Sequence, residues 1–165
     1  MRKQEFNSAE TSIKQIACLF KSKWAEFKPD DVVLDYGGGK YNLVADFMAD
    51  KVAKFHTVDK FNRCEQWNNF HIMAAMFEGC NVVTCANVLN VIKEDDVVDD
   101  VIRIVHKITS DRAIFCVYEG DKSGKGRKTQ KSSWQRNERA AEYERRIAKY
   151  FKNVKRHGNI IVASK

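Results

Sequence analysis

Two patterns of apolar residues alternate along the chain. Short runs rich in β-branched residues predict strands that are covered on both faces. These runs are VVLDY (32–36), FHTVD (55–59), NVVTC (81–85) and AIFCVYE (113–119). Near the C-terminus, NVKRHGNIIVAS places two further short runs around the turn His157-Gly158-Asn159, which predicts a hairpin.

Longer stretches with helical spacing separate the strands. They predict helices over residues 8–25, 43–52, 65–77, 94–108 and 134–152. In the helix over 65–77, the buried side is expected to be Trp67, Phe70, Met73, Ala74 and Phe77. In the last helix, basic residues such as Arg136 are expected to point outward. The alternation predicts an α/β fold, a Rossmann-like doubly wound sheet that is mostly parallel with an antiparallel C-terminal hairpin.

The charge is unevenly distributed. The chain has 29 Lys and Arg against 22 Asp and Glu, a net charge of +7. Residues 1–120 hold 15 basic and 18 acidic residues, whereas residues 121–165 hold 14 and 4. The basic excess therefore belongs to the last quarter, where a surface for an anionic partner and an ordinary solvated surface both stay open.

Targeting and metal signals are weak. The N-terminus lacks an apolar leader and no window approaches the ~18 apolar residues of a membrane span, so we expect a cytoplasmic protein without a membrane partner. The five cysteines (18, 64, 80, 85 and 116) form no CxxC pair and mostly lie in apolar stretches, which predicts reduced core thiols. The histidines show no ligand spacing, so no metal site is predicted.

A glycine turn follows the first predicted strand. In Asp35-Tyr36-Gly37-Gly38-Gly39, the glycines permit a tight turn and the close approach of a ligand. Asp59 ends the next strand, 22 residues after Gly37, where a carboxylate can accept both hydroxyls of a ribose. Because ligands bind at the carboxyl ends of parallel strands, these features favour a nucleoside ligand there.

Two departures narrow the choice of ligand. A dinucleotide fingerprint needs a glycine where Asn42 stands, and Asp35 would repel a pyrophosphate. That carboxylate suits a cationic ligand instead. S-adenosylmethionine carries an ammonium and a sulfonium and no phosphate, so it matches the charge pattern.

The motifs VVLDYGGGK, VDKFNR and VVTCANVLNVI resemble the class I, Rossmann-like S-adenosylmethionine-dependent methyltransferases, especially short bacterial and phage members with an LDYG(G/C)G loop. The resemblance implies a set of cofactor-binding residues: Asp35, Tyr36, Gly37, Gly39, Asp59, Phe61, Asn87 and Leu89. Within this set, Asp59 would hold the ribose and Phe61 would pack beside the adenine. Asn87 and Leu89 would border the sulfonium.

The chain also departs from that family. Tyr41 replaces the usual third small residue of the glycine loop. Between the second and third predicted strands there is room for one helix and little else, so the strand that usually carries a second adenine-contacting acid is expected to be missing. The sheet would then have about six strands.

Methyl transfer is an in-line displacement at a sulfonium, so alignment supplies much of the rate and a general base is optional. The candidates at the strand ends are Asn87 and Asn90 as orienting groups and Glu119 as a proton acceptor. Asn90 as a helix cap and Glu119 as an ion-pair partner are equally open.

Residue types exclude several kinds of methylation. The exocyclic-amine DNA methyltransferases resemble one another in a (D/N/S)PP(Y/F/W) motif, and the cytosine carbon-5 enzymes in a Pro-Cys nucleophile. Neither is possible here, because Pro29 is the single proline. The Lys-Asp-Lys-Glu tetrad of ribose methylation would need an acid where Ala86 and Asn87 stand.

The leading hypothesis is a methyltransferase with a nucleic-acid acceptor favoured over a small molecule or protein. Phosphate contacts are expected from Lys122, Lys125, Arg127, Lys128 and Lys131. A non-catalytic module that binds S-adenosylmethionine or nucleic acid, and an enzyme that cleaves S-adenosylmethionine, stay open, as do the acceptor and the oligomeric state.

One domain over residues 1–165 accommodates these features. Its expected parts are an N-terminal helix (8–25), a cofactor-binding core (32–119), a mobile basic loop (120–133), and a helix with the terminal hairpin (134–165).

Overall fold

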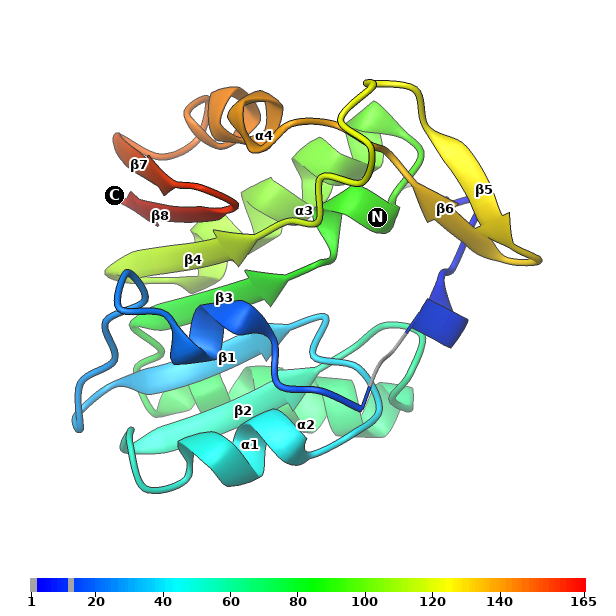
Figure 1. Cartoon of the computed structure of the whole chain (residues 1–165). Coiled ribbons are helices and arrows are strands. Elements are labelled where there is room, and N and C mark those ends of the chain that lie inside the picture. The colour runs from blue at the N-terminus through cyan, green and yellow to red at the C-terminus, as the bar shows by residue number, and fades with distance from the viewer. Residues whose placement is uncertain (1–2, 12–13) are drawn as a thin grey trace.

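A six-stranded sheet forms the centre of the computed structural model, which describes residues 3–11 and 14–165. The strand order is β2-β1-β3-β4-β8-β7 (Figure 1). The strands are β1 (Val32–Tyr36), β2 (Lys54–Val58), β3 (Val82–Ala86), β4 (Arg112–Cys116), β7 (Asn153–His157) and β8 (Ile160–Ser164). β1 to β4 run parallel, and the β7–β8 hairpin adds antiparallel strands beside β4, which confirms the predicted fold class and the reduced sheet.

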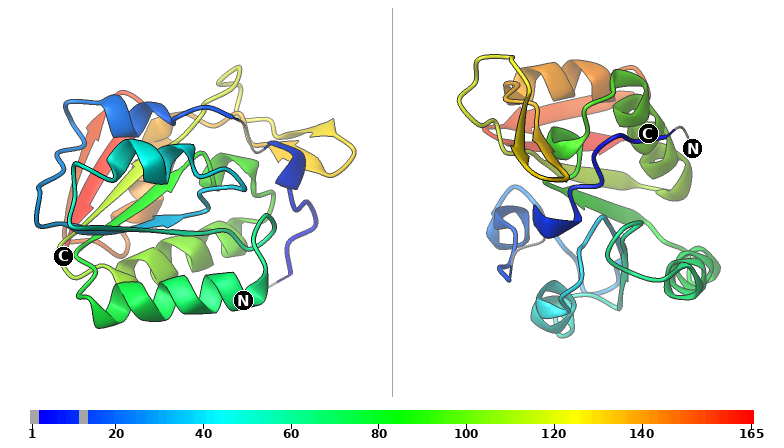
Figure 2. Two further views of the ribbon diagram at one scale, coloured as in Figure 1. Left: turned by 90° about the horizontal axis from the view of Figure 1, so that it is seen from below. Right: turned by 90° about the vertical axis from the view of Figure 1, so that its right-hand side faces the viewer.

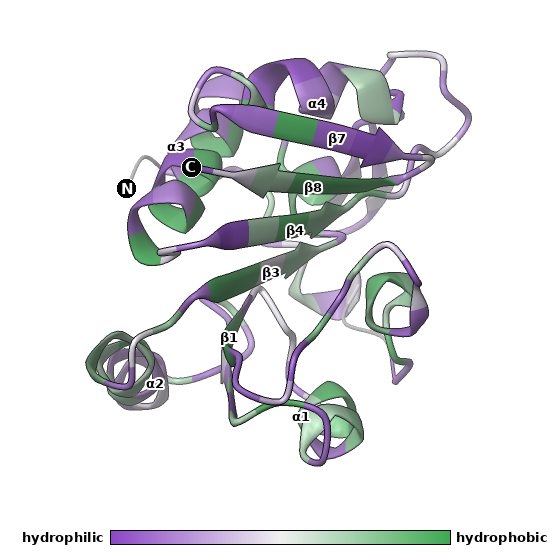
Figure 3. Cartoon of the chain, turned by 90° about the vertical axis from the view of Figure 1, so that its left-hand side faces the viewer, coloured by the Kyte–Doolittle hydropathy of each residue, from purple (hydrophilic) through white to green (hydrophobic). Residues whose placement is uncertain are grey.

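Helices cover both faces of this sheet. Their bounds are α1 (Leu43–Met48), α2 (Glu65–Phe77), α3 (Asp95–Ile108) and α4 (Ala140–Ile147). α2, α3 and α4 lie on one face, and α1 with the N-terminal segment lies on the other (Figure 2). Strands β3, β4 and β8 are hydrophobic along most of their length (Figure 3), as expected of interior strands, whereas the edge strand β7 is mostly hydrophilic.

The predicted N-terminal helix over residues 8–25 is wrong. Its described residues form two short 3-10 helices, η1 (Ala9–Thr11) and η2 (Cys18–Lys21), while Ile13 lies outside the described residues. Ser8 has φ 51° and donates its backbone N–H to Ser132 O at 2.9 Å. The segment therefore forms hydrogen bonds with a neighbouring strand turn in place of a continuous helix ladder.

The last predicted helix is shorter than expected. α4 begins at Ala140, and residues before it form β6 (Ser133–Gln135), which pairs with β5 (Arg127–Gln130) in a second, two-stranded sheet. The predicted basic loop over 120–133 thus contains most of an ordered hairpin. The outward position predicted for Arg136 is also wrong: its side chain is 6% exposed.

The buried guanidinium group of Arg136 contacts two backbone carbonyl groups and two carboxylates. Its guanidinium donates to Ile92 O at 3.1 Å and Lys93 O at 3.0 Å, and it pairs with Asp95 and Glu138. These partners offset much of the cost of burying the guanidinium, because they occupy both of its terminal nitrogens, whereas Nε is buried without a partner.

Two predictions about burial also need correction. Cys18 and Cys64 are exposed, so only Cys80, Cys85 and Cys116 are core thiols. On α2, the expected buried side is largely exposed, and the helix instead buries Ala75 against the sheet.

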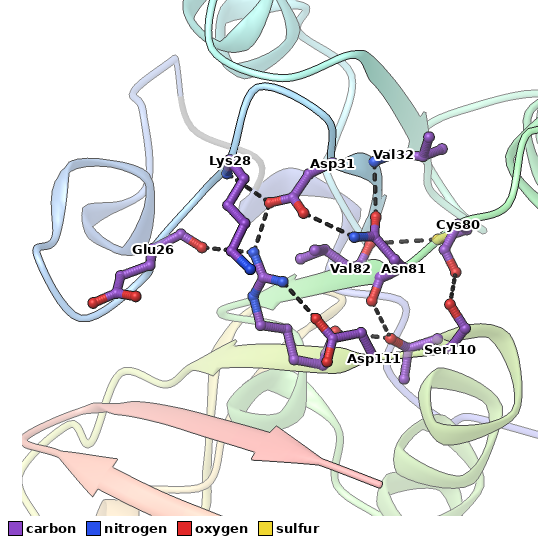
Figure 4. Close-up of polar contacts among 11 residues, drawn as sticks. Glu26, Lys28, Asp31, Val32, Cys80, Asn81, Val82, Ser110 and Asp111 are labelled. Carbon is purple, nitrogen blue, oxygen red and sulfur yellow. Dashed lines mark hydrogen bonds and ion pairs between the residues drawn. The ribbon is translucent and has the colours of Figure 1, made fainter.

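A polar network fixes the amino ends of three parallel strands (Figure 4). Arg112 pairs with the buried Asp31 at 2.6 Å, and Asn81 donates to the same carboxylate at 2.8 Å. Asn81 also accepts the Val32 N–H at 2.8 Å. These residues lie at the amino ends of β1, β3 and β4. The network therefore fixes the register of the three strands relative to one another, and with it the positions of their carboxyl ends. Within the part of the chain that is described, no helix is both long and apolar enough to cross a bilayer.

Candidate functional site

The glycine turn lies at the carboxyl end of β1 and is attached to β2. Gly37 N and Gly38 N both donate to Val58 O, at 2.8 and 3.1 Å. Gly37 has φ +82°, and a Cβ at this position would collide with the Val88 side chain. Only glycine therefore fits Gly37, both for backbone conformation and for space.

Asp59 joins the glycine turn to the loop after β2. Its Oδ2 accepts Gly39 N–H at 2.9 Å. Its Oδ1 accepts the N–H groups of Phe61 and Asn62, each at 2.9 Å, and the Asn62 side-chain amide at 3.1 Å. Oδ2 is thus the oxygen with more capacity left for a ligand hydroxyl, and the carboxylate has a fixed orientation.

Asp35 lies beneath the same turn and is buried. Burial raises the pKa of its carboxyl group to about 7, against the effect of a 2.7 Å hydrogen bond from Thr84 and with a further rise from the charge of Asp59. A Cβ at Gly38 would collide with Asp35 Oδ2, so this oxygen is directed at the turn. A cation bound at the turn would favour the ionised form of Asp35.

Arg63 holds the turn from outside, a role that the sequence analysis missed. Its Nε donates to Gly39 O at 2.9 Å and its Nη2 to Asn42 Oδ1 at 2.8 Å. Its guanidinium also stacks 4.9 Å from the centroid of the Trp67 ring. The only sequence signal was its place in VDKFNR, four residues after Asp59.

Aromatic side chains lie around the turn. Phe61, next to Asp59 in space, is 38% exposed, and the departure Tyr41 is 37% exposed. Tyr36 is half-buried, and burial raises the pKa of its phenol to about 12. Phe61 therefore offers an accessible ring at the position where the resemblance implies one.

The residues after β3 have different surroundings. Asn87 adopts φ 57°, donates its N–H to Cys116 O at 2.8 Å and has a half-buried side chain. Leu89 is fully buried in the hydrophobic core, so its side chain does not line an open surface. Of Asn87 and Leu89, only Asn87 has a side chain that is partly accessible at the end of β3.

Asn90 and Glu119 have structural partners. Asn90 donates to Gln135 Oε1 at 3.2 Å and accepts Tyr118 N–H at 3.3 Å. Glu119 accepts the N–H of Ala140, at the start of α4, at 2.7 Å and pairs with Lys122 at 3.1 Å. These contacts, the first above all, lower the pKa of Glu119. Glu119 therefore has the ion-pair partner that one of its two predictions gave it. Asn90 is not the predicted cap of the next helix, whose N-cap is Glu94, and its side chain instead links Tyr118 to Gln135.

The β5–β6 hairpin extends beyond the carboxyl ends of the parallel strands (Figure 1). Of the predicted phosphate contacts, all five residues are exposed: Lys122, Lys125, Arg127, Lys128 and Lys131. The hairpin is held by stacking of Trp134 on Phe6, with ring centroids 5.3 Å apart. The basic residues thus lie at the same end of the sheet as the glycine turn.

A groove of about 590 Å³ with both polar and apolar lining residues lies away from this site, on the sheet face beside Trp24 and His157. The two rings stack with centroids 4.0 Å apart. None of the predicted site residues lines this groove.

Comparison with known proteins gives one kind of match. No protein-family model and no curated protein sequence matches the chain. Among solved structures, it is similar to magnesium protoporphyrin IX methyltransferase (ChlM) from Synechocystis PCC 6803 with bound SAM, with a TM-score of 0.52 and 15% identity over 83% of this chain and 71% of that one. The chain therefore shares the Rossmann-like fold of that structure. At this identity the likeness establishes the architecture in which the glycine turn and Asp59 lie.

Proposed function

We propose that this chain is an S-adenosylmethionine-dependent methyltransferase. The observation that carries the proposal is the hydrogen bond from Gly39 N to Asp59 Oδ2, with Asp35 directed at the same turn from below. The similar ChlM structure contains bound SAM, which supports the same cofactor here.

The residues at the turn fit this cofactor. Asp59 Oδ2 would accept a ribose hydroxyl, and the exposed ring of Phe61 would cover the adenine. Asp35 would face the ammonium group, which suits a carboxylate whose charge is costly without a cation. When bound, S-adenosylmethionine supplies an electrophilic methyl group on a sulfonium.

The chain's own contribution to the reaction would be positioning. Arg63 and Asp59 fix the glycine turn from two sides, and Asn87 stands at the end of β3 where an acceptor would approach. Holding the reacting groups in line is worth up to ~7 to 11 kcal/mol in favourable cases. Methyl transfer would therefore not require Glu119 as a proton acceptor, and Glu119 can keep its hydrogen bond to Ala140 N at the start of α4.

We further propose a nucleic-acid acceptor. The support is the exposed basic hairpin, whose residues Lys125, Arg127, Lys128 and Lys131 extend from the end of the sheet that carries the glycine turn. Lysine and arginine in such a position neutralise backbone phosphates without reading sequence.

Calorimetry with S-adenosylmethionine tests the cofactor. We expect binding by the wild-type chain and its loss in Asp59→Ala. The matched control is Asp50→Ala, because Asp50 is an exposed carboxylate just after α1. Absence of binding by the folded wild-type chain would contradict the proposal.

A product assay tests the reaction. Protein incubated with methyl-labelled cofactor and separate nucleic-acid, protein and metabolite fractions is expected to yield S-adenosylhomocysteine and labelled nucleic acid. Methylthioadenosine would indicate cleavage of the cofactor, and unchanged cofactor would indicate a binding module.

Salt dependence tests the acceptor surface. Replacing Lys125, Arg127, Lys128 and Lys131 by Glu should abolish nucleic-acid binding, and wild-type binding should weaken steeply with salt. The control variant reverses Lys152 and Lys155, which are exposed on and before β7. Equal loss in both variants would show only a general effect of net charge.

A further inference from the structure

The outward side of α2 is an exposed apolar surface. Its four large side chains are Phe70 (66% exposed), Met73 (71%), Met76 (62%) and Phe77 (93%). Phe70, Met73 and Phe77 lie opposite Ala75, which the helix buries against the sheet, and Met76 lies beside them. We call these four residues the α2 face.

The area of this surface is large for a small domain. At these exposures, four Phe and Met side chains present on the order of 500 Å². Contiguous apolar patches of roughly 300–600 Å² mark the largest such area of a typical monomer and are often functional. The α2 face alone thus supplies more than half of the roughly 800 Å² that each partner buries in a stable interface.

The edge strand β2 lies next to α2 and is bonded to it. β2 is the outermost strand of the sheet, and its Val58 O points toward β1, where it accepts Gly37 N–H. Thr57 O must then point outward, and the Trp67 indole N–H donates to it at 2.8 Å. This bond occupies one outward carbonyl group of the edge strand and fixes α2 against β2.

The charge of α2 selects among possible partners. Between Glu65 and Glu78 the helix carries no Asp, Glu, Lys or Arg, although the chain as a whole has a net charge of +7. A neutral face offers a charged partner no specific attraction. It does suit an identical face, which repeats the same apolar side chains without opposing charges.

We propose that the α2 face pairs with the same face of a second copy of the chain. Two copies of α2 packed antiparallel about a two-fold axis near Met73 place Phe70 of each copy opposite Phe77 of the other. Such an isologous contact would bury the apolar side chains of the α2 face in both copies. This inference is independent of the proposed function.

Sedimentation velocity over a range of concentrations tests the pairing. We expect the wild-type chain to approach twice its mass of 19.1 kDa as concentration rises. Phe70→Glu with Phe77→Glu should weaken dimerisation roughly 100-fold or more. The control is Ala148→Glu, an exposed apolar position after α4, which should leave the dimer unchanged. Circular dichroism verifies that each variant is folded.

A charge pair tests the geometry. Phe70→Lys alone and Phe77→Glu alone should each weaken the dimer, whereas the two together should restore part of it, because opposite charges then face each other twice. A folded wild-type chain that stays monomeric up to its solubility limit would overturn the proposal, even if the α2 face binds another protein. A dimer that survives the Phe70→Glu and Phe77→Glu changes would overturn it as well.

Discussion

The hydroxyl group of Thr84 donates a 2.7 Å hydrogen bond to Oδ1 of Asp35 inside the sheet. This bond favours the carboxylate, yet burial outweighs it and raises the pKa of Asp35 from 3.8 to about 7. Without a cationic ligand, the folded chain therefore keeps a proton at Asp35 that the unfolded chain releases. Stability and ligand binding both become functions of pH through this one group.

The first prediction concerns stability. The unfolded chain loses the Asp35 proton near pH 3.8 and the folded chain near pH 7, so between these values the unfolded state binds fewer protons and stability falls as pH rises. The loss attributable to Asp35 is on the order of 4 kcal/mol above about pH 7. Urea unfolding of the wild type and Asp35→Asn measures it, and the variant should lack this pH dependence. Asp30→Asn, at an exposed position, should retain it.

The second prediction concerns a cationic ligand. Such a ligand binds the ionised form of Asp35, so affinity for S-adenosylmethionine should rise with pH up to about 7, by at most tenfold per pH unit. Calorimetry across this range measures the slope. A slope unchanged in Asp35→Asn would assign it to another group.

The third prediction uses two glycines with the same backbone conformation. Gly37 and Gly79 both have φ +82°, but a Cβ at Gly37 would collide with Val88, whereas nothing lies within 4 Å of one at Gly79. Gly79→Ala should cost about 1 kcal/mol of stability, and Gly37→Ala should cost more and weaken cofactor binding. Denaturant unfolding compares the two. Equal costs would mean that Val88 moves aside freely.

The fourth prediction separates structure from catalysis at Glu119. Because Glu119 accepts Ala140 N–H, Glu119→Ala should destabilise the fold by about 1 kcal/mol, while Glu119→Gln keeps an acceptor oxygen and much of that stability. Methyl transfer by the Gln variant should keep its kcat and pH profile. A large fall in kcat with the fold intact would restore Glu119 as a proton acceptor.

The fifth prediction concerns the buried Arg136. Arg136→Met leaves Glu138 without its cation and removes donors from Ile92 O and Lys93 O, so it should cost about 3 to 5 kcal/mol. Arg145→Met is the control, because Arg145 is 72% exposed and its pair with Glu142 contributes below about 1 kcal/mol. Thermal unfolding of both variants checks the difference.

Sequence patterns predicted the parallel strands well because the β-branched residues of these strands favour extended backbone wherever they occur. VVLDY and NVVTC have β-branched residues on both faces, and the structure buries both faces. The glycine turn and Asp59 could also be placed, because each follows directly from a strand end. The hydrogen bond from Gly39 N to Asp59 Oδ2 links residues 20 positions apart in sequence, and the spacing of apolar residues does not predict such a contact.

The errors share a physical cause. Helical spacing identified α2 and its bounds correctly, but spacing does not say which side the sheet lies on, and Phe70 and Phe77 point away from it. Arg136 is predicted to point outward because most of its partners, Asp95 and the carbonyl groups of Ile92 and Lys93, come from a segment more than 40 residues away. The segment Ser133–Gln135 forms a strand because Arg127–Gln130 is available to pair with it. In each case tertiary contacts override local preference.

The position of β8 has a consequence for how the protein is made. β8 lies between β4 and the edge strand β7, so the last of the described strands in sequence order is an interior strand of the sheet. During synthesis, β4 emerges well before Ile160–Ser164, and its hydrophobic outer edge stays unpaired in that interval. Unpaired strand edges are where nascent chains aggregate. The six-stranded sheet is thus completed only after residues 160–164 are made, and until then the β4 edge has no partner strand.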